Sequence, residues 1–298
     1  MMIIKFIAGF LMSLADSVPG VSGGTIVFLL GLYDEFILSL NNIASKDKEK
    51  RTRAFKFLIK LGCGWVIGMA LAALVITAVF EENIYIVSSL FLGFIVFALP
   101  IIIIEEKQDF IGKYKNLVFL ILGAAVVVLI TYGSLNFDMG GKSYAWGDFN
   151  VLDGIYLFLV AMIAISAMVL PGISGSTIML VFGVYSGVME VVSGCIKGLF
   201  KFDFTYFPAA AVFGFGLIAG VLSVVKGLKY MLTKHHSAMV YAIVGMMIGS
   251  IYSVIMGPLS IESDVELTAL NMSNFSWIAF VIGGAVIFGL QGLKKVLK

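Results

Sequence analysis

Charged residues are scarce in this chain, and their scarcity limits the class of fold. Asp, Glu, Lys and Arg make up 13% of the 298 residues, whereas a soluble domain carries about 25%. Apolar residues make up 60%, and runs close to the ~20 residues that a helix needs to cross a bilayer recur along the chain. A transmembrane β-barrel is excluded because its strands alternate in short segments. The composition therefore predicts an all-α polytopic integral membrane protein, with membrane lipids and no nucleic acid as partners.

Cysteine and histidine are nearly absent as well. The two cysteines, Cys63 and Cys195, are expected toward opposite membrane faces, so no disulfide is predicted. His235 and His236 follow Lys234 in what reads as a solvated cytoplasmic loop near lipid head groups. No His, Arg and Lys constellation is available to hold and attack a phosphate, which argues against an enzyme such as a lipid phosphatase. No nucleotide-binding motif is identified, so an ion gradient or the membrane potential is the expected energy source, and the sequence leaves metal binding open.

Proline is rare too, and two of the five prolines lie in a motif that occurs twice. Residues 16–25 read DSVPGVSGGT, and residues 169–177 read VLPGISGST. A constant offset of 152 positions pairs Pro19 with Pro171, Gly20 with Gly172, Ser22 with Ser174, Gly23 with Gly175, Thr25 with Thr177, Gly31 with Gly183 and Tyr33 with Tyr185. Chance does not give that run, so the chain contains an internal repeat. The second copy departs from the first in having Ser176 where the first has Gly24.

Each copy interrupts an apolar segment, and three further apolar segments follow it. In the first half, the pieces around the motif are residues 3–15 and 25–40, and spans are expected at 57–80, 84–104 and 117–132. In the second half, the pieces are residues 155–169 and 177–196, and spans are expected at 206–225, 239–256 and 275–290. We therefore predict one membrane domain, 1–298, in which a loop at 133–150 joins repeat one (1–135) to repeat two (151–298).

Parity and charge together predict the topology. A broken or re-entrant helical pair plus three transmembrane helices crosses the membrane an odd number of times, so the second repeat must be inverted. With both termini cytoplasmic, 17 of the 20 Lys and Arg residues fall inside, as the positive-inside rule requires. The loop at 133–150 is then external. Three tryptophans near predicted membrane boundaries are expected to be interfacial anchors: Trp65, Trp146 and Trp277.

The repeated motif predicts a substrate site. Pro-Gly pairs break helices, and broken backbone at membrane depth survives only when it packs in protein or lines a wet cavity. Ser22 and Ser174 are expected to be N-caps of the half-helices that follow, whose free N–H groups favour an anion. Facing broken helices in inverted repeats are how many secondary transporters build a site near the midplane. The alternative is that the motifs are only small-residue packing sites. The predicted substrate-binding residues are Pro19, Gly20, Ser22, Gly23, Gly24, Thr25, Pro171, Gly172, Ser174, Gly175, Ser176 and Thr177, with Tyr33 and Tyr185 in support.

One charge breaks the symmetry of the repeat. The apolar segments carry no Lys or Arg away from their ends, so an anion would be held by backbone N–H groups, hydroxyls and helix termini. Asp16 lies beside the first turn, where the second copy has Met168. A carboxylate in this position is either a site for a coupling cation, sodium or a proton, or a structural cap. Apart from such a cation no cofactor is expected, and the sequence specifies neither the coupling ion nor the oligomeric state.

At these residues the chain resembles the membrane family catalogued as domain of unknown function 368, the polyprenyl-phosphate (undecaprenyl-phosphate) translocases of bacteria and archaea. The likeness covers essentially the full length and is most specific at residues 16–25 and 171–177, with the Gly and Tyr that follow each. The resemblance implies a prokaryotic cytoplasmic membrane protein and a lipid-phosphate substrate. It also implies a direction, in which the carrier released outside during cell-wall synthesis is flipped back to the cytoplasmic leaflet. From the residues alone, a channel or exchanger for a small anion would use the same half-helix termini.

Overall fold

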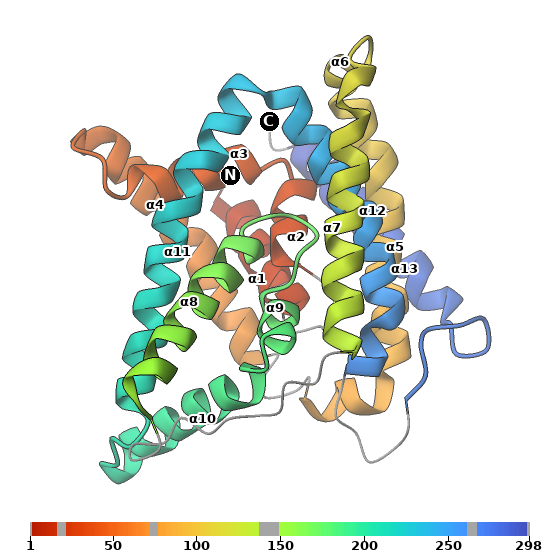
Figure 1. The fold of residues 1–298 in the computed structure, drawn as a ribbon. Coiled ribbons are helices and arrows are strands. Elements are labelled where there is room, and N and C mark those ends of the chain that lie inside the picture. Colours follow the sequence, from red (N-terminus) through yellow and green to blue (C-terminus); the bar gives the residue numbers. More distant parts are fainter. Residues whose placement is uncertain (1, 17–21, 72–76, 137–148, 261–266, 297–298) are drawn as a thin grey trace.

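The computed structural model describes residues 2–16, 22–71, 77–136, 149–260 and 267–296, and every regular element among them is a helix (Figure 1). This confirms the predicted all-α class. Five segments of the described chain are long and apolar enough to cross a membrane: Asn83–Glu105, Tyr114–Gly133, Val151–Met168, Phe207–Lys234 and His236–Leu259.

Each motif region contains three helices instead of the predicted two. In the first half these are α1 (Met2–Asp16), α2 (Gly23–Leu29) and α3 (Tyr33–Asn42), and in the second half α8 (Val151–Met168), α9 (Gly175–Val181) and α10 (Tyr185–Lys201). The predicted continuous pieces at 25–40 and 177–196 are therefore wrong. Gly31 and Gly183 both have φ of 64°, the left-handed conformation with which glycine commonly ends a helix. Beyond Gly31, α3 is bent by 116° from α2.

The chain turns back on itself in both motif regions. Lys5, near the start of α1, forms an ion pair with Glu35 in the first turn of α3. In the second half, the Tyr156 hydroxyl at the start of α8 donates to the Phe182 carbonyl just after α9, at 2.7 Å. Because the end of each excursion lies beside its beginning, α1–α2 and α8–α9 have the shape of re-entrant hairpins. In Figure 1, α1 descends to the centre from the top and α8 rises to it from the bottom.

Longer helices surround the two hairpins. They are α4 (Lys48–Leu71), α5 (Thr77–Glu105), α7 (Leu117–Asn136), α11 (Phe207–Lys234), α12 (His236–Met256) and α13 (Trp277–Val296), with the short pieces α6 (Lys107–Phe110), η2 (Tyr114–Asn116) and η3 (Gly257–Ser260). The predicted span at 57–80 runs across residues 72–76, which lie outside the described residues; its described parts belong to α4, up to Leu71, and to α5, from Thr77. The backbone is non-helical at Asn83, inside α5. Hydropathy alone does not locate a chain reversal within a continuous apolar stretch.

Helix pairs pack closely through small residues. The most extensive pairs are α1 with α4 and α8 with α11, each within one half, and α5 with α13 and α7 with α12, each between halves. A side chain at Gly9 would overlap the Leu61 carbonyl, and one at Gly245 would overlap the Leu120 carbonyl. Close backbone approach at small residues is typical of helices that associate in lipid. The pairs between halves hold the two motif regions together.

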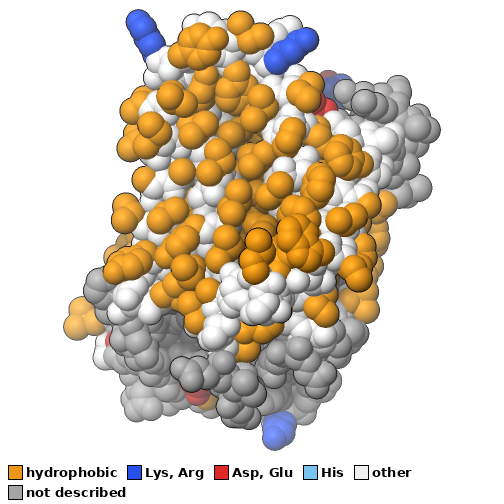
Figure 2. Space-filling model, turned by 90° about the vertical axis from the view of Figure 1, so that its right-hand side faces the viewer, with side chains coloured by type: hydrophobic (Ala, Val, Ile, Leu, Met, Phe, Trp, Pro, Cys, Tyr) orange, Lys and Arg blue, Asp and Glu red, His pale blue; other side chains and the backbone are white. Residues whose placement is uncertain are grey.

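The surface has the polarity of a membrane protein. Figure 2 shows a broad hydrophobic side with Lys and Arg side chains only near its ends. In Figure 1 the start of α1, the end of α13, α6 and the junction of α11 with α12 all lie at the top. The start of α1 and the end of α13 therefore lie toward the same end of the molecule, and the cytoplasmic location of both termini stays a prediction. Most of the predicted external loop, residues 137–148, lies outside the described residues, as does Trp146.

Candidate functional site

The N-terminus of α2 is capped by a carboxylate. Ser22 occupies the N-cap position with an extended backbone, as predicted, but its side chain makes no capping hydrogen bond. Instead, the Gly23 N–H donates to Asp16 Oδ1 at 2.8 Å. The indole N–H of Trp65 donates to Asp16 Oδ2 at 3.0 Å. Asp16 thus joins α1, α2 and α4. Trp65, which is partly buried, is a hydrogen-bond partner of this carboxylate, and its role as an interfacial anchor stays a prediction.

The two motifs touch each other through hydroxyl groups. The Ser22 hydroxyl donates to the Leu170 carbonyl at 3.3 Å, and the Gly172 N–H donates to Thr25 Oγ1 at 2.8 Å. A Cβ at Gly24 would lie 3.1 Å from the Met168 carbonyl oxygen, so the backbones are close here as well. Residues separated by almost half the chain therefore form one buried cluster, as the facing-hairpin prediction requires.

Motif two packs against α12. Gly172 has φ of 92°, and a Cβ there would lie 2.7 Å from the Met246 carbonyl group. Only glycine satisfies both the backbone conformation and the space. The Gly172 carbonyl accepts a hydrogen bond from Ser250 Oγ at 3.0 Å. The Pro-Gly turn is consequently held by packing and by a hydroxyl, which is how interrupted helices are satisfied at membrane depth.

Four hydroxyls surround a small cavity beside motif two. The cavity has a volume of about 10 Å³ and is lined by residues of the motif and of α7 and α12: Val127, Ile130, Thr131, Gly172, Ile173, Ser174, Thr177 and Ser253. Thr131 and Ser253 hydrogen-bond to each other at 2.5 Å, and Ser174 bonds to Ser176 at 2.7 Å. This volume suits about one water molecule. A phosphate group, with five heavy atoms, requires the surrounding groups to separate.

A second cavity opens sideways next to the motifs. This lateral groove has a volume of about 670 Å³ and lies between α4 and α8, with α1 and α3 contributing to its wall: Met12, Phe36, Leu58, Ile59, Leu61, Gly62, Cys63, Trp65, Val66, Ile67, Ile165 and Met168. Ile59 and Val66 at its rim are each 60% exposed. Trp65 and Met168 line the groove and also contact the buried residues where the two motifs meet, here called the motif cluster. Trp65 bonds to Asp16, and the Met168 carbonyl lies against Gly24. The groove therefore leads from the molecule's apolar periphery to the paired motifs.

The predicted site residues are mostly brought together. The described residues Gly23, Gly24, Thr25, Pro171, Gly172, Ser174, Gly175 and Thr177 are all buried. Pro19 and Gly20 lie outside the described residues, as does Val18. Val18 and Gly20 are the repeat counterparts of Leu170 and Gly172, the residues of motif two that Ser22 and Thr25 contact. Tyr33 is 2% exposed, and its hydroxyl has no hydrogen-bond partner within the described part of the chain. Tyr185 begins α10 in the same register and is half-buried.

Sequence reasoning missed the polar groups that the surrounding helices supply. Thr131 on α7 and Ser250 and Ser253 on α12 are buried among apolar residues. A single hydroxyl in an apolar span belongs to no motif with a recognisable spacing. Its occurrence within a membrane span is only a weak indication of function. His236 was missed for another reason. It was assigned to a solvated loop, yet it is half-buried and begins α12.

Comparisons with known proteins agree with this architecture. The family described as undecaprenyl phosphate translocase-like matches residues 12–271. A polyprenyl-phosphate transporter of Staphylococcus aureus is 33% identical over 283 residues, covering 94% of this chain and 93% of its own. A polyprenyl-phosphate transporter of Vibrio cholerae is 30% identical over 257 residues, covering 83% and 75%. No solved structure matches the chain significantly. The chain belongs to the undecaprenyl phosphate translocase-like family of multi-pass membrane proteins.

Proposed function

We propose that this protein is a flippase for undecaprenyl phosphate or a related polyprenyl phosphate. In this proposal the phosphate binds between the two motifs while the polyprenyl tail occupies the lateral groove and the adjoining bilayer. The names of the relatives support the substrate class. The observation that carries the mechanism is the continuity of the lateral groove with the motif cluster at Trp65 and Met168. A substrate with a polar head and an apolar tail needs both environments side by side.

Binding requires the motifs to part. In the structure the Gly172 N–H is already engaged by Thr25, and the cavity nearby holds about one water. A phosphate would exchange these contacts between motifs for contacts with itself, using the hydroxyls and N–H groups of both. Hydrogen bonds to a charged group are worth about 1.5–3 kcal/mol each, more than the ~1 kcal/mol of a neutral pair, so the exchange is favourable. The present conformation is then the occluded, ligand-free member of a transport cycle.

The direction and the energy source extend the proposal. We place both termini in the cytoplasm because 17 of the 20 Lys and Arg residues then fall on the cytoplasmic side. We treat the halves as inverted repeats because α1 and α8 approach the centre from opposite ends (Figure 1). Inverted repeats permit the motif cluster to open to either side in turn. Net transport would return the carrier to the cytoplasmic leaflet for cell-envelope synthesis. A cation or proton at Asp16 would offset the charge of the phosphate, and catalysis has no part in this scheme.

Substitutions in the lateral groove distinguish a lipid flippase from a channel for small anions. Purified protein in vesicles would be assayed for flipping of fluorescent polyprenyl phosphate and for flux of inorganic phosphate. Ile165→Trp fills the groove from α8, and Ile163→Trp, on the same helix, adds the same bulk at a position that is 42% exposed and outside the groove. We expect Ile165→Trp to reduce lipid flipping at least tenfold and Ile163→Trp to leave it unchanged. Inorganic phosphate flux by the wild-type chain, unaffected by Ile165→Trp, would instead identify a small-anion channel.

A further inference from the structure

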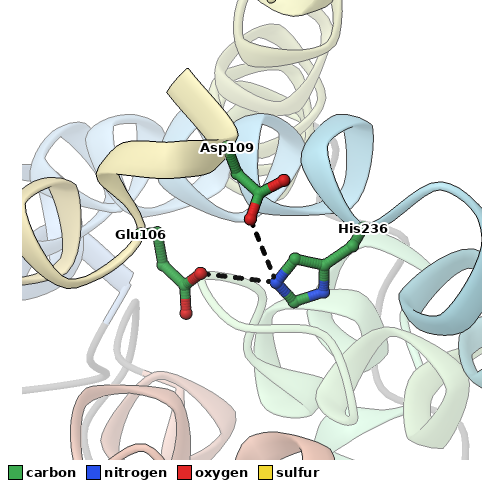
Figure 3. A group of neighbouring side chains, drawn as sticks. All are labelled: Glu106, Asp109 and His236. Carbon is green, nitrogen blue, oxygen red and sulfur yellow. Dashed lines mark hydrogen bonds and ion pairs between the residues drawn. The ribbon is translucent and has the colours of Figure 1, made fainter. Parts of the chain in front are cut away.

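Three side chains from two distant segments converge at the end of the molecule where both termini lie. Glu106 lies at the junction of α5 and α6, Asp109 lies in α6, and His236 is the first residue of α12 (Figure 3). His236 Nε2 lies 3.3 Å from Glu106 Oε2 and 3.7 Å from Asp109 Oδ2. All three side chains are partly exposed, between 19% and 35%. The cluster is accessible from solvent and lies outside both the motif cluster and the lateral groove.

The hydrogen bonds of His236 define which nitrogen faces the carboxylates. Its Nδ1 lies 3.3 Å from the Leu232 carbonyl, which can only accept, so Nδ1 carries the hydrogen. In the neutral ring, Nε2 then presents a lone pair to two carboxylate oxygens. Three electron-rich atoms pointing at one another repel unless a positive charge lies among them. A histidine whose other nitrogen donates to a backbone carbonyl is also the usual form of a metal ligand.

The spacing of the three atoms fits a metal ion. Bonds of 2.0–2.1 Å to Zn²⁺ in tetrahedral geometry separate ligand atoms by roughly 3.3 Å. The two measured separations from Nε2 are 3.3 and 3.7 Å, and all three ligand atoms lie within 4.8 Å of one another. Lys113 pairs with Asp109 through the other oxygen, Oδ1, at 2.6 Å. Oδ2 therefore remains directed toward His236.

The segments that carry the three ligands are already fixed against each other. Ser237 Oγ donates to the Asp109 carbonyl at 2.6 Å, and the Tyr241 hydroxyl donates to the Phe110 carbonyl at 3.2 Å. The rings of Phe110 and Tyr241 pack at 4.6 Å between centroids. Asn116 donates to Ser237 Oγ at 2.8 Å. These contacts hold α6 on the first turns of α12, so little further ordering is needed to bind an ion.

We propose that Glu106, Asp109 and His236 bind a divalent transition-metal ion, such as Zn²⁺ or Mn²⁺, that clamps the α5–α6 turn to the start of α12. Mixed imidazole and carboxylate ligands suit this class of ion. The site is separate from the coupling cation proposed at Asp16. Met246, which packs against Gly172, lies ten positions after His236 in α12, a distance of about 15 Å along a helix. The ion acts on the motif cluster only through the position of α12.

Metal binding is tested on the full-length chain in detergent with Cys63→Ser in every sample, because the exposed Cys63 thiol could also bind zinc. Metal-stripped protein is titrated with Zn²⁺ or Mn²⁺, and the bound metal is counted after desalting. We expect one ion per chain and thermal stabilisation by the ion. The isosteric variant Glu106→Gln and the variant His236→Ala should bind at least tenfold more weakly, while their metal-free melting temperatures stay close to that of the parent. His235→Ala is the matched control, because that ring packs against Tyr230 and not in the cluster.

Two results would overturn the proposal. One is that the parent protein, with the cluster intact, retains no ion at millimolar metal, which would leave the contacts of His236 with Glu106 and Asp109 as a structural link alone. The other is equal binding by the parent, Glu106→Gln and His236→Ala, which would place the ion elsewhere. Because the readouts are metal content and melting temperature, neither result depends on whether the protein flips lipids.

Discussion

The two copies of the motif share their sequence but satisfy their polar groups differently. Motif one ends its broken helix with a charge, since Asp16 accepts from both Gly23 and Trp65. Motif two has Met168 in place of Asp16 and relies on hydroxyls from other segments, Thr25 on the Gly172 N–H and Ser250 on the Gly172 carbonyl. The described part of the first copy thus relies on a carboxylate within its own motif, whereas the second copy has hydroxyls from other segments at both polar groups of Gly172. Two copies of one motif can therefore share their sequence and still satisfy their backbone polar groups with different partners.

The largest expected effect follows from the dependence of motif two on close packing. Gly172→Ala forces a left-handed backbone on alanine and places Cβ against Met246, which together should cost about 2–5 kcal/mol. Gly175→Ala, three residues away, meets the Met168 side chain at 3.5 Å and the Ala164 carbonyl oxygen at 3.6 Å, which are ordinary contact distances, and should change stability by less than about 1 kcal/mol. The folded fraction remaining after heating in detergent compares the two. Equal stability would show that α12 does not constrain the second turn.

A smaller effect separates the two equivalent threonines. Thr25→Val removes the acceptor of the buried Gly172 N–H and should cost about 1–3 kcal/mol of stability. Thr177 lines the small cavity, and its hydroxyl makes no hydrogen bond within the described residues. Thr177→Val should therefore leave stability nearly unchanged but weaken polyprenyl-phosphate binding roughly ten- to a hundredfold, the value of one hydrogen bond to a charged group. Unchanged affinity in alanine variants of Ser22, Thr25, Ser174 and Thr177 alike would remove these hydroxyls from the site.

A small effect on stability is expected at Asp16. Asp16→Asn keeps an oxygen acceptor for Gly23 and loses only the bond from Trp65, about 1 kcal/mol. If the carboxylate carries a proton during transport, the variant should bind lipid phosphate but lose its dependence on pH. If it binds sodium, affinity should fall and sodium should no longer stimulate transport. Flipping assays under imposed gradients distinguish these cases, and wild-type gradient dependence would leave Asp16 as a cap alone.

The sequence predicted the relation between the motifs better than their local contacts. Parity and the repeat offset were enough to expect facing hairpins, because both depend on the whole chain and not on any one side chain. The breaks at Gly31 and Gly183 were not predicted, since an apolar run on both sides of a glycine looks continuous to hydropathy. The bond from Trp65 to Asp16 and the hydroxyls of Ser250 and Ser253 were also beyond prediction. Each depends on which faces of packed helices meet, which composition does not encode.

The central claim is that the paired motifs must separate for lipid phosphate to pass, and one reversible cross-link tests it directly. Ser22 Oγ lies 3.3 Å from the Leu170 carbonyl, so Ser22→Cys and Leu170→Cys, in a chain with Cys63→Ser and Cys195→Ser, place two thiols within reach of a short bifunctional thiol-reactive reagent that attaches through reducible disulfides. Flipping of fluorescent polyprenyl phosphate is then followed in vesicles before and after reduction. We predict that the joined protein does not flip and that cleavage of the link restores flipping. Flipping at the same rate with the motifs joined would contradict the account.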